Sequence, residues 1–310
     1  MVVKVKNLVK RYGDVIVLDH FNLEVAEGEI FGLLGPNGSG KTTTINCILS
    51  LLKYDKGSIE VFGKPMNPDS YDSKRNIGIV MQNVAVFKEL TVYENINYFC
   101  GLYVPERKKC AALVDEAIHF VGLEDYKKYY PKKLSGGLLR RLNIACGIAH
   151  KPKLIILDEP TVAVDPQSRN SILEGIQNLN KNGATIIYTS HYMEEVEQIC
   201  TRIAIMDKGK IIAQGTKDEL KGMIRMGEKI TVELIQPDRS LLTGLKDISS
   251  VSSAELNGNT LVIKTEPGHN GLDVILEYLK TKNAAHGRIY CELPTLNDVF
   301  LEITGKELRD

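Results

Sequence analysis

The sequence predicts an α/β protein of two domains, a larger one built on a sheet wrapped by helices and a smaller α+β one. Three observations predict this fold class. A glycine-rich loop lies between an apolar run and a helix-like segment, and strand patterns alternate with helical patterns up to about residue 222. A strand–helix–strand–strand–helix–strand pattern then begins near residue 228. We therefore expect the domains to cover residues 1–222 and 228–310.

The first domain opens with short β-branched strands separated by turn residues, and it continues with alternating strands and helices. Alternation of this kind predicts a parallel sheet with helices packed on it. An insertion at about residues 86–149 is mainly helical and predicts a lobe on that sheet. The expected strands cover residues 2–8, 15–18, 21–25, 30–34, 57–63, 77–81, 153–157 and 185–188, and the expected helical stretches cover residues 41–52, 91–122 and 139–149.

The glycine-rich loop has the G-x-x-x-x-G-K-T spacing of a phosphate-binding loop, and it sits between a strand and a helix as that motif requires. Its glycines let backbone N–H groups surround an anion, while the following helix points its positive end at the same anion. Lys41 would contact the β- and γ-phosphates, and the Thr42 hydroxyl suits Mg²⁺. A glycine-rich turn that only caps a helix is the alternative, which the context disfavours. The predicted nucleotide-binding residues are Gly35, Pro36, Asn37, Gly38, Ser39, Gly40, Lys41, Thr42 and Thr43.

Composition narrows the class of protein. Lysine plus arginine and aspartate plus glutamate both number 39, so the formal net charge is zero and we expect no nucleic-acid partner. The 6 cysteines form no C-x-x-C pair, which indicates small core residues in a reducing compartment and no disulfide partner. The amino terminus lacks a secretory apolar region, and no run of about 18 apolar residues occurs. We expect a cytoplasmic chain, so that any membrane span belongs to another polypeptide.

Polar residues follow three of the predicted strands, at the edge where open parallel sheets bind their ligands. Asp158 and Glu159 follow one strand. Asp158 would hold Mg²⁺ through water, and Glu159 would polarise the attacking water. His191 follows a second strand and would donate to the γ-phosphate, and Gln82 follows a third with an amide that can reach both Mg²⁺ and water. Solvated acids at a strand end and a structural histidine are the alternatives, which the upstream phosphate loop disfavours.

The segment Leu134-Ser135-Gly136-Gly137-Leu138 opens the predicted helix at residues 139–149. Ser135 can cap that helix, and Gly136 and Gly137 expose its N–H groups, so the segment predicts a second anion site. One bound triphosphate has no evident use for two separate cradles. The second cradle is explained if it closes over the γ-phosphate held by another copy of the chain. A capped helix without a ligand is the alternative, and it would be favoured if this motif stood alone.

The order of these motifs resembles that of an ATP-binding-cassette (ABC) ATPase, over roughly residues 1–222. The resemblance implies a P-loop ABC ATPase domain with a mixed sheet core and a helical lobe, with ATP and Mg²⁺ as cofactors. It implies a head-to-tail homodimer in which Ser135 and Gly137 of one copy bind the γ-phosphate held by the other. It also implies that Tyr12 stacks on adenine and that Asp165 lies in the loop coupling the two sites.

The chain departs from the family pattern at two places. Leu138 stands where the signature motif normally has glutamine, and Ala163-Val164 precede Asp165 where glycine and leucine are common. We expect no hydrogen bond from position 138 and an unchanged backbone cradle. Because this chain carries both Glu159 and Ser135, a homodimer would have two competent sites.

The second domain reads as a β-α-β-β-α-β unit followed by a helix, the pattern of a ferredoxin-like α+β domain. Asn257-Gly258-Asn259 between two strand patterns is a strong hairpin signal. His269, His286 and Cys291 lack metal-ligand spacing, and we expect them at surface or core positions. The expected strands cover residues 229–235, 252–256, 261–265 and 288–293, and the expected helices cover residues 238–248, 272–282 and 295–304.

Two short segments, residues 162–169 and 293–300, resemble cassette subunits of drug, antibiotic and sodium exporters. That resemblance implies a separate ABC-2-type membrane permease, contacted by residues 82–94, and a chain held on the inner face of the cell membrane by that permease. We therefore predict the ATP-hydrolysing subunit of a two-component exporter of drugs, antibiotics, ions or lipid-like compounds. ATP-driven dimer closure and hydrolysis would power the permease.

Two other classes of function are alternatives. A soluble ABC ATPase could act on ribosomes, DNA or protein partners without a permease. Ribosome-acting members usually carry two cassettes and the DNA-repair type a long coiled coil, whereas this chain has one set of motifs and no sustained heptads. A nucleotide-dependent binding module without turnover is disfavoured by Glu159.

Overall fold

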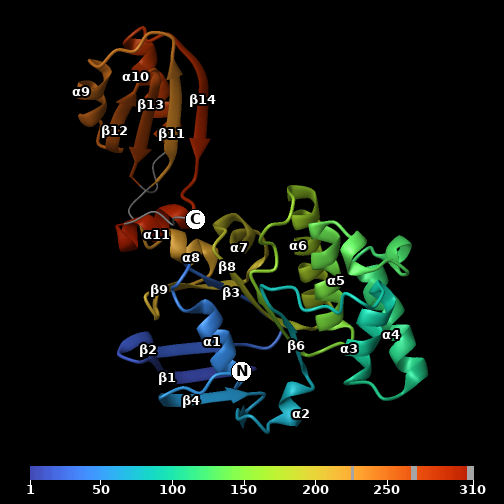
Figure 1. The fold of residues 1–310 in the computed structure, drawn as a ribbon. Coiled ribbons are helices and arrows are strands. Elements are labelled where there is room, and N and C mark those ends of the chain that lie inside the picture. Colours follow the sequence, from blue (N-terminus) through green and yellow to red (C-terminus); the bar gives the residue numbers. More distant parts are fainter. Residues whose placement is uncertain (225–226, 267–270, 306–310) are drawn as a thin grey trace. The chain divides into compact units, whose positions relative to one another are not determined.

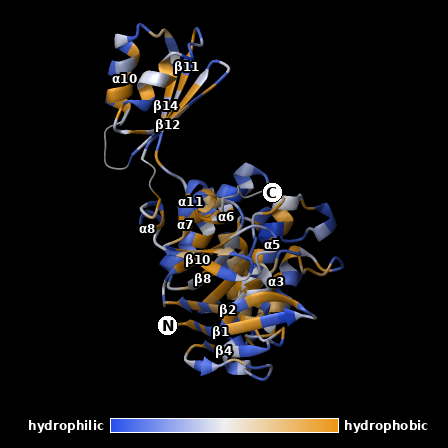
Figure 2. Cartoon of the chain, turned by 90° about the vertical axis from the view of Figure 1, so that its left-hand side faces the viewer, coloured by the Kyte–Doolittle hydropathy of each residue, from blue (hydrophilic) through white to orange (hydrophobic). Residues whose placement is uncertain are grey.

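Two compact units make up the chain in the computed structural model, which describes residues 1–224, 227–266 and 271–305 (Figure 1). Residues 1–217 form the first unit, and the described residues from 218 onward form the second. The sequence placed the boundary between residues 222 and 228, a few residues later than this division. Each unit has an apolar core of its own, as the hydrophobic colouring along its strands indicates (Figure 2).

A six-stranded sheet forms the centre of the first unit, in the order β10-β9-β3-β8-β7-β6 (Figure 1). Its strands are β3 (Ile30–Leu34), β6 (Ile77–Val80), β7 (Leu154–Asp158), β8 (Thr185–Ser190), β9 (Arg202–Asp207) and β10 (Lys210–Gly215). All pair in parallel except β10, which joins β9 antiparallel. Every residue of β3, β7 and β8 is buried, as expected for strands covered on both faces. The α/β fold with a mixed sheet is confirmed, and β9 and β10 are strands that the sequence analysis missed.

A second sheet of the first unit is antiparallel, in the order β2-β1-β4-β5. Its strands are β1 (Val3–Tyr12), β2 (Val15–Val25), β4 (Lys56–Val61) and β5 (Lys64–Pro65). The prediction of separate strands at residues 15–18 and 21–25 was wrong, because β2 is continuous. Its register against β1 shifts between Leu18 and Phe21, and His20 has a left-handed φ of 49°. A bulge therefore lets the strand continue through residues 19 and 20.

The helical lobe is built from α3 (Val92–Gly101), α4 (Arg107–Phe120) and α5 (Gly136–Ile148), with short 3₁₀ turns at Glu124–Tyr126 and Pro131–Lys133. The helical pattern predicted at residues 91–122 is two helices, since Pro105 lies between them. A capping box begins α3, in which the Thr91 hydroxyl accepts from Glu94 N and Glu94 Oε2 accepts from Thr91 N at 2.8 Å. The three helices enclose their own apolar core, which includes Val92, Ile96, Leu113 and Leu142.

Four further helices complete the first unit, namely α1 (Lys41–Ile48), α2 (Tyr71–Lys74), α6 (Pro166–Lys181) and α7 (Met193–Ile199). The expected extension of α1 to residue 52 was wrong, because the chain turns at Ser50, whose φ is 52°. The sequence analysis did not predict α2, α6 or α7. No described helix is both long enough and apolar enough to cross a membrane.

The second unit contains α8 (Lys217–Lys221), β11 (Lys229–Leu234), α9 (Leu241–Lys246), β12 (Val251–Asn257), β13 (Thr260–Thr265), α10 (Gly271–Thr281), β14 (His286–Glu292) and α11 (Leu296–Thr304). Its antiparallel sheet has the order β12-β13-β11-β14, which is that of the predicted ferredoxin-like unit. The predicted hairpin joins β12 to β13, and Gly258 has a φ of 60°. Five cysteines are buried as expected, but Cys291 is exposed, because it lies on edge strand β14. His286 is exposed, and His269 lies outside the described residues.

Candidate active site

The phosphate loop connects β3 to α1, and its backbone has the shape that its glycines predict. Gly38 and Gly40 adopt left-handed φ angles of 80° and 110°. A side chain at Gly35 would collide with the carbonyl oxygen of Met206, and one at Gly40 would come within 2.7 Å of the Met206 methyl group. Ser39 Oγ is buried and has no hydrogen-bond partner among the described residues. An unsatisfied hydroxyl beside this backbone cradle fits a phosphate oxygen.

Lys41 opens α1 and lies folded over the loop, with 4% of its surface exposed. Its Nζ donates to the carbonyl oxygens of Gly35 at 2.8 Å and Pro36 at 3.2 Å. The same Nζ lies 3.2 Å from Glu159 Oε1, forming a buried ion pair. The loop, the lysine and the acid at the end of β7 therefore meet at one place, and the lysine is positioned to exchange these partners for phosphate oxygens.

Glu159 is the point where the three predicted catalytic residues come together. Gln82 Nε2 donates to Glu159 Oε2 at 3.2 Å, and His191 Nδ1 lies 3.4 Å from the same oxygen. The three residues follow β6, β7 and β8, which are neighbours in the sheet. Glu159 is 6% exposed and has a left-handed φ of 48°, an uncommon conformation for a residue other than glycine. The turn after β7 therefore aims this carboxylate at Lys41 instead of letting it point into solvent.

Asp158 lies beside Glu159 but faces a different set of groups. Its Oδ2 accepts from Thr42 Oγ1 at 2.9 Å, and its Oδ1 accepts from Thr189 Oγ1 at 2.7 Å. Thr189 pairs with Asp158 in the parallel register of β7 and β8, and its hydroxyl also accepts from Glu159 N at 3.0 Å. Thr189 thus fixes both acids. The sequence analysis missed this role because it depends on strand register.

The donor set at this edge fits Mg²⁺. Thr42, Asp158 and Gln82 offer a hydroxyl, a carboxylate and an amide oxygen, which are hard oxygen ligands. Among residues 1–224, 227–266 and 271–305, no cluster of three or more His, Cys, Asp or Glu side chains could hold a metal ion unaided. An ion bound here would therefore share its coordination with phosphate oxygens, as Mg²⁺ does in nucleotide sites.

The second predicted cradle lies at the start of α5. Ser135 is the N-cap residue, exposed to solvent, and its Oγ accepts from Leu138 N at 3.3 Å. Helix α5 packs against α3, α4 and β6, whereas α1, which follows the phosphate loop, packs against β2, β4 and β7. The two cradles therefore belong to different parts of the first unit. Leu138, at the position where glutamine is normal, packs against the apolar core of the lobe.

Asp165 lies against this second cradle. Its carboxylate caps α6 by accepting from Ser168 N at 2.9 Å, and this hydrogen bond holds the Asp165 pKa below its usual value. A side chain at Gly137 would lie 2.6 Å from Ser168 Oγ and 3.1 Å from Asp165 Oδ2. Gly136 is exposed at the first turn of α5, whereas Gly137 is buried beneath the start of α6. The glycine at 137 is therefore explained by this close packing.

Tyr12 ends β1 on the surface of the first unit, with 51% of its area exposed. Lys10 Nζ lies 4.8 Å from the centre of its ring. An exposed aromatic face of this kind can stack on an adenine base. About half of this residue is therefore open to solvent and available to a base.

Glu195 is a buried carboxylate that the sequence analysis also missed. It accepts from Tyr188 OH at 2.7 Å, Thr161 Oγ1 at 2.8 Å and Ser190 Oγ at 3.1 Å. Burial raises the pKa of Tyr188, which keeps this hydroxyl protonated and able to donate. Because Ser190 precedes His191, the network fixes the turn that presents the imidazole.

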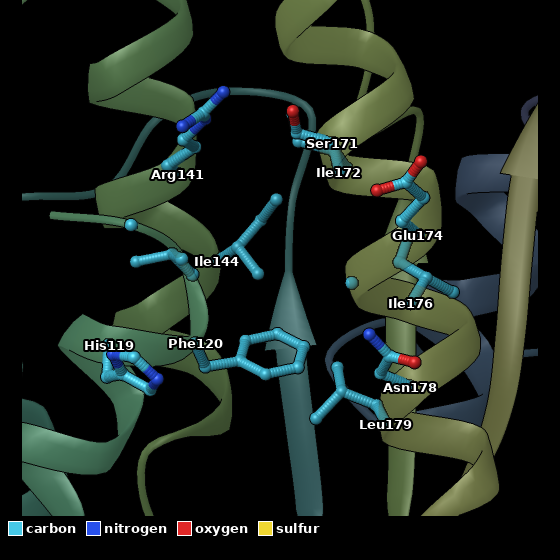
Figure 3. A pocket seen from close by; sticks show the side chains of 13 residues that line it. His119, Phe120, Arg141, Ile144, Ser171, Ile172, Glu174, Ile176, Asn178 and Leu179 are labelled. Carbon is cyan, nitrogen blue, oxygen red and sulfur yellow. The ribbon is translucent and has the colours of Figure 1, made fainter.

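A pocket of about 280 Å³ lies away from these residues, between the helical lobe and α6 (Figure 3). Arg141 faces Ser171 and Glu174 at one end, and Phe120 and Leu179 line the other. Nε of Arg141 has no hydrogen-bond partner among the described residues. None of the predicted site residues lines this pocket.

Comparison with known proteins gives the family. A family model described as ABC transporter matches residues 18–162. The chain is 39% identical to the linearmycin resistance ATP-binding protein LnrL of Bacillus subtilis (strain 168), over 98% of this chain and 99% of that protein. The chain belongs to the ABC transporter ATP-binding proteins. As an ABC protein it is also 35% identical to Nod factor export ATP-binding protein I of Paraburkholderia xenovorans (strain LB400), over 97% of this chain and 96% of that protein.

Solved structures agree with this assignment. The ABC chain is similar to a structure described as the ATP binding subunit of an ABC transporter, with a TM-score of 0.66 and 26% identity over 72% of this chain and 93% of that one. It is similar to the dimeric post-hydrolysis cassette MJ0796 bound to ADP and Pi, with a TM-score of 0.63 and 27% identity over 69% of this chain and 98% of that one. This chain is an ATP-binding ABC ATPase.

Proposed function

We propose that the chain is the ATP-hydrolysing subunit of an exporter whose membrane-spanning part is a separate ABC-2-type permease. The observation that carries the ATPase half is the meeting of Lys41, Gln82 and His191 around Glu159, beside the phosphate loop. The exporter half is supported by relatives that match nearly the whole chain and are named for resistance or export. The daunorubicin resistance ATP-binding protein DrrA3 of Streptomyces coeruleorubidus is another, 33% identical over 97% of this chain.

Binding of ATP would rearrange the charges around Glu159. Lys41 now neutralises that carboxylate at 3.2 Å and binds two loop carbonyl oxygens. A triphosphate in the cradle offers the lysine a larger negative charge, and the Lys41 ammonium would move to the β- and γ-phosphates. Glu159 would then lose its cationic partner at the moment when the substrate arrives, which leaves its carboxylate free to accept a proton.

Hydrolysis would proceed with Glu159 as the general base toward the attacking water. His191 would donate a hydrogen bond to the γ-phosphate, and Gln82 would orient the same water. Thr42, Asp158 and Gln82 would hold Mg²⁺, whose chemistry here is to neutralise charge on the phosphate oxygens. Thr189 would keep both acids in place through its two hydrogen bonds.

The complete site would contain a second copy of the chain. Ser135 is exposed at the N-terminus of α5 and would bind the γ-phosphate held by the other copy. The similarity to the dimeric MJ0796 cassette supports this arrangement. Closure would depend on nucleotide because ATP supplies the negative charge that both helix N-termini neutralise, and loss of the γ-phosphate would reopen the dimer.

The permease contact is proposed at residues 82–94, which join the sheet to the helical lobe. Phe87 packs its ring against Tyr98 of α3 with centroids 4.9 Å apart, and the two residues are 42% and 47% exposed. Val84 is exposed beside them. Exposed aromatic groups that are already ordered by mutual contact suit a protein interface. The chain would sit on the inner face of the membrane through this contact, and the exported molecules would be drugs, antibiotics, ions or lipid-like compounds.

The test is purification of the tagged chain from detergent-solubilised cells of its source, followed by mass spectrometry. We expect a near-stoichiometric polytopic membrane protein, and we expect Phe87→Ser to lower its recovery while leaving the ATPase activity of the purified chain unchanged. Recovery of ribosomal, DNA-bound or only soluble partners, in several detergents, would refute the exporter half. The ATPase half is tested separately by phosphate release from the purified chain.

A further inference from the structure

Arg140 lies in α5, five residues beyond the Ser135 cap, and it is 3% exposed. All three nitrogens of its guanidinium donate hydrogen bonds to backbone carbonyl oxygens. Nε donates to Pro160 O at 2.6 Å, Nη1 donates to Met81 O and Gln82 O at 2.9 Å each, and Nη2 donates to Glu159 O at 2.7 Å and Asp158 O at 3.4 Å.

These carbonyl oxygens come from two segments that are far apart in the sequence. One follows β6 and carries Gln82, and the other follows β7 and carries Glu159. Both segments leave the sheet at its ligand-binding edge, where their carbonyl groups have no further strand to pair with. The planar fork of the guanidinium spans both, so one side chain of the helical lobe fixes the backbone under the two catalytic side chains.

Loss of the hydrogen bonds made by Arg140 would carry a large free-energy cost. Burial lowers the pKa of Arg140, whereas the nearby Asp158 carboxylate raises it. Hydrogen bonds from a charged donor are about twice as strong as neutral ones, and carbonyl oxygens left unpaired in a buried site carry a desolvation penalty. Such an arrangement specifies a fixed geometry between α5 and the ends of β6 and β7.

Helix α5 is continuous from the second cradle to this residue, a distance of roughly 7.5 Å along its axis. A displacement of Ser135 by the ATP of another copy would therefore carry Arg140 with it, and Arg140 is hydrogen-bonded to the backbone of Gln82 and Glu159. We propose that Arg140 is a positioning residue that transmits closure over the second copy's ATP to the catalytic carboxylate of its own copy. The inference rests on the proposed function, because it uses the two-copy site.

Two substitutions of Arg140 and one control test this role in the full-length chain. Arg140→Gln keeps donors but cannot span both segments, and Arg140→Lys keeps the charge with a single nitrogen. Arg141→Gln is the matched control, because it removes an adjacent charge that faces the pocket beside α6 (Figure 3). We measure monomer affinity for a fluorescent ATP analogue, KM and kcat for ATP, and ATP-driven dimerisation in a Glu159→Gln background.

We expect Arg140→Gln to lower kcat at least 30-fold while the monomer affinity, KM and the ATP concentration for dimerisation each change less than about threefold. Arg140→Lys should recover part of kcat, and Arg141→Gln should stay within about threefold of the parent. A parent-like kcat for Arg140→Gln would overturn the proposal, and so would parallel losses of ATP binding, dimerisation and kcat in that variant. An equal loss of kcat in Arg141→Gln would also overturn it, as would failure of both Arg140 variants to fold. If the Glu159→Gln parent itself fails to dimerise with ATP, the two-copy site is refuted and with it the basis of the inference.

Discussion

Three polar side chains contact the Glu159 carboxylate, one from α1 and two from the turns after β6 and β8, and this carboxylate is the proposed general base. The substitution Glu159→Gln keeps the shape of the side chain but removes its charge and its ability to take a proton. We expect kcat to fall at least ~100-fold, since general-base catalysis contributes about 10²–10⁴. ATP should still bind and should trap a dimer. Phosphate release and light scattering in the presence of ATP measure the two effects, and turnover within about threefold of the parent would remove the general-base assignment.

Thr189 and Thr185 form a matched pair on β8. Both are buried hydroxyls that accept a backbone N–H, from Glu159 at 3.0 Å and from Gly28 at 3.0 Å. Valine at either position keeps the volume and removes the hydrogen bonds, so each variant should lose about 1–2 kcal/mol of unfolding free energy. Only Thr189→Val should also lower kcat, by roughly tenfold, because only Thr189 orients Asp158 and Glu159. Equal kcat values in the two variants would contradict this.

Single residues were predictable from the sequence where a motif supplied their order and chemistry. Lys41, Gln82, Glu159 and His191 were placed at one site on that basis, and the structure brings them together. Arg140 was missed because its partners are backbone carbonyl oxygens. Every residue has one, so the residue types in the sequence do not reveal these contacts. The available signal was a pair of arginines, Arg140 and Arg141, within a mostly apolar helical stretch, and it does not tell one from the other.

At the scale of elements, hydrophobic periodicity and the positions of glycine and proline located most strands and helices but misplaced several of their boundaries. The stretches at residues 15–18 and 21–25 were interpreted as two strands, whereas the structure joins them through a bulge. The sequence analysis did not predict the short elements β5 and α2, nor the longer elements β9, β10, α6 and α7. Their burial depends on long-range neighbours: β9 pairs with β3, more than 150 residues earlier in the chain.

The junction between α3 and α5 contains a titratable group. His150 follows α5 and stacks on Tyr103 with ring centroids 4.0 Å apart, and burial lowers its pKa to about 4. Between that value and the ordinary histidine pKa of about 6.5, the unfolded chain binds a proton that the folded chain does not, so stability falls as the pH falls. We expect a loss of roughly 2 kcal/mol from this residue between pH 7.5 and pH 5.

The variant His150→Phe keeps a stacked ring but does not titrate. Urea unfolding of the parent and the variant at both pH values gives the comparison. The parent should lose more stability than the variant on acidification. The same loss in both proteins would show that other groups cause the pH dependence.

At the scale of the whole molecule, the proposed dimer gives every copy one half of each of two sites. Ser135→Arg disables the half that binds the γ-phosphate of the other copy, and Glu159→Gln disables the half that carries the general base. Each variant alone should be nearly inactive in hydrolysis. A mixture of the two should regain activity, because the heterodimer pairs an intact Glu159 with an intact Ser135 at one of its two sites.

Random pairing in an equal mixture makes about half of the dimers mixed, so the recovery should approach roughly one quarter of the parent activity if a single site turns over. The control replaces the Glu159→Gln partner by a chain carrying both substitutions, and it should restore nothing. Absence of recovery in the first mixture, with dimers detected, would argue against a site shared between copies.

The register of β7 and β8 limits which insertions and deletions the sequence can accept during evolution. Asp158 stands opposite Thr189, and successive side chains of a strand point to opposite faces. Loss of one residue within β7 would place Glu159 opposite Thr189, where Asp158 now lies. The Asp158 side chain would then point to the opposite face of the sheet. We therefore expect insertions and deletions to be tolerated in the loops at the far edge and in the helical lobe, and not between the reacting groups of the site.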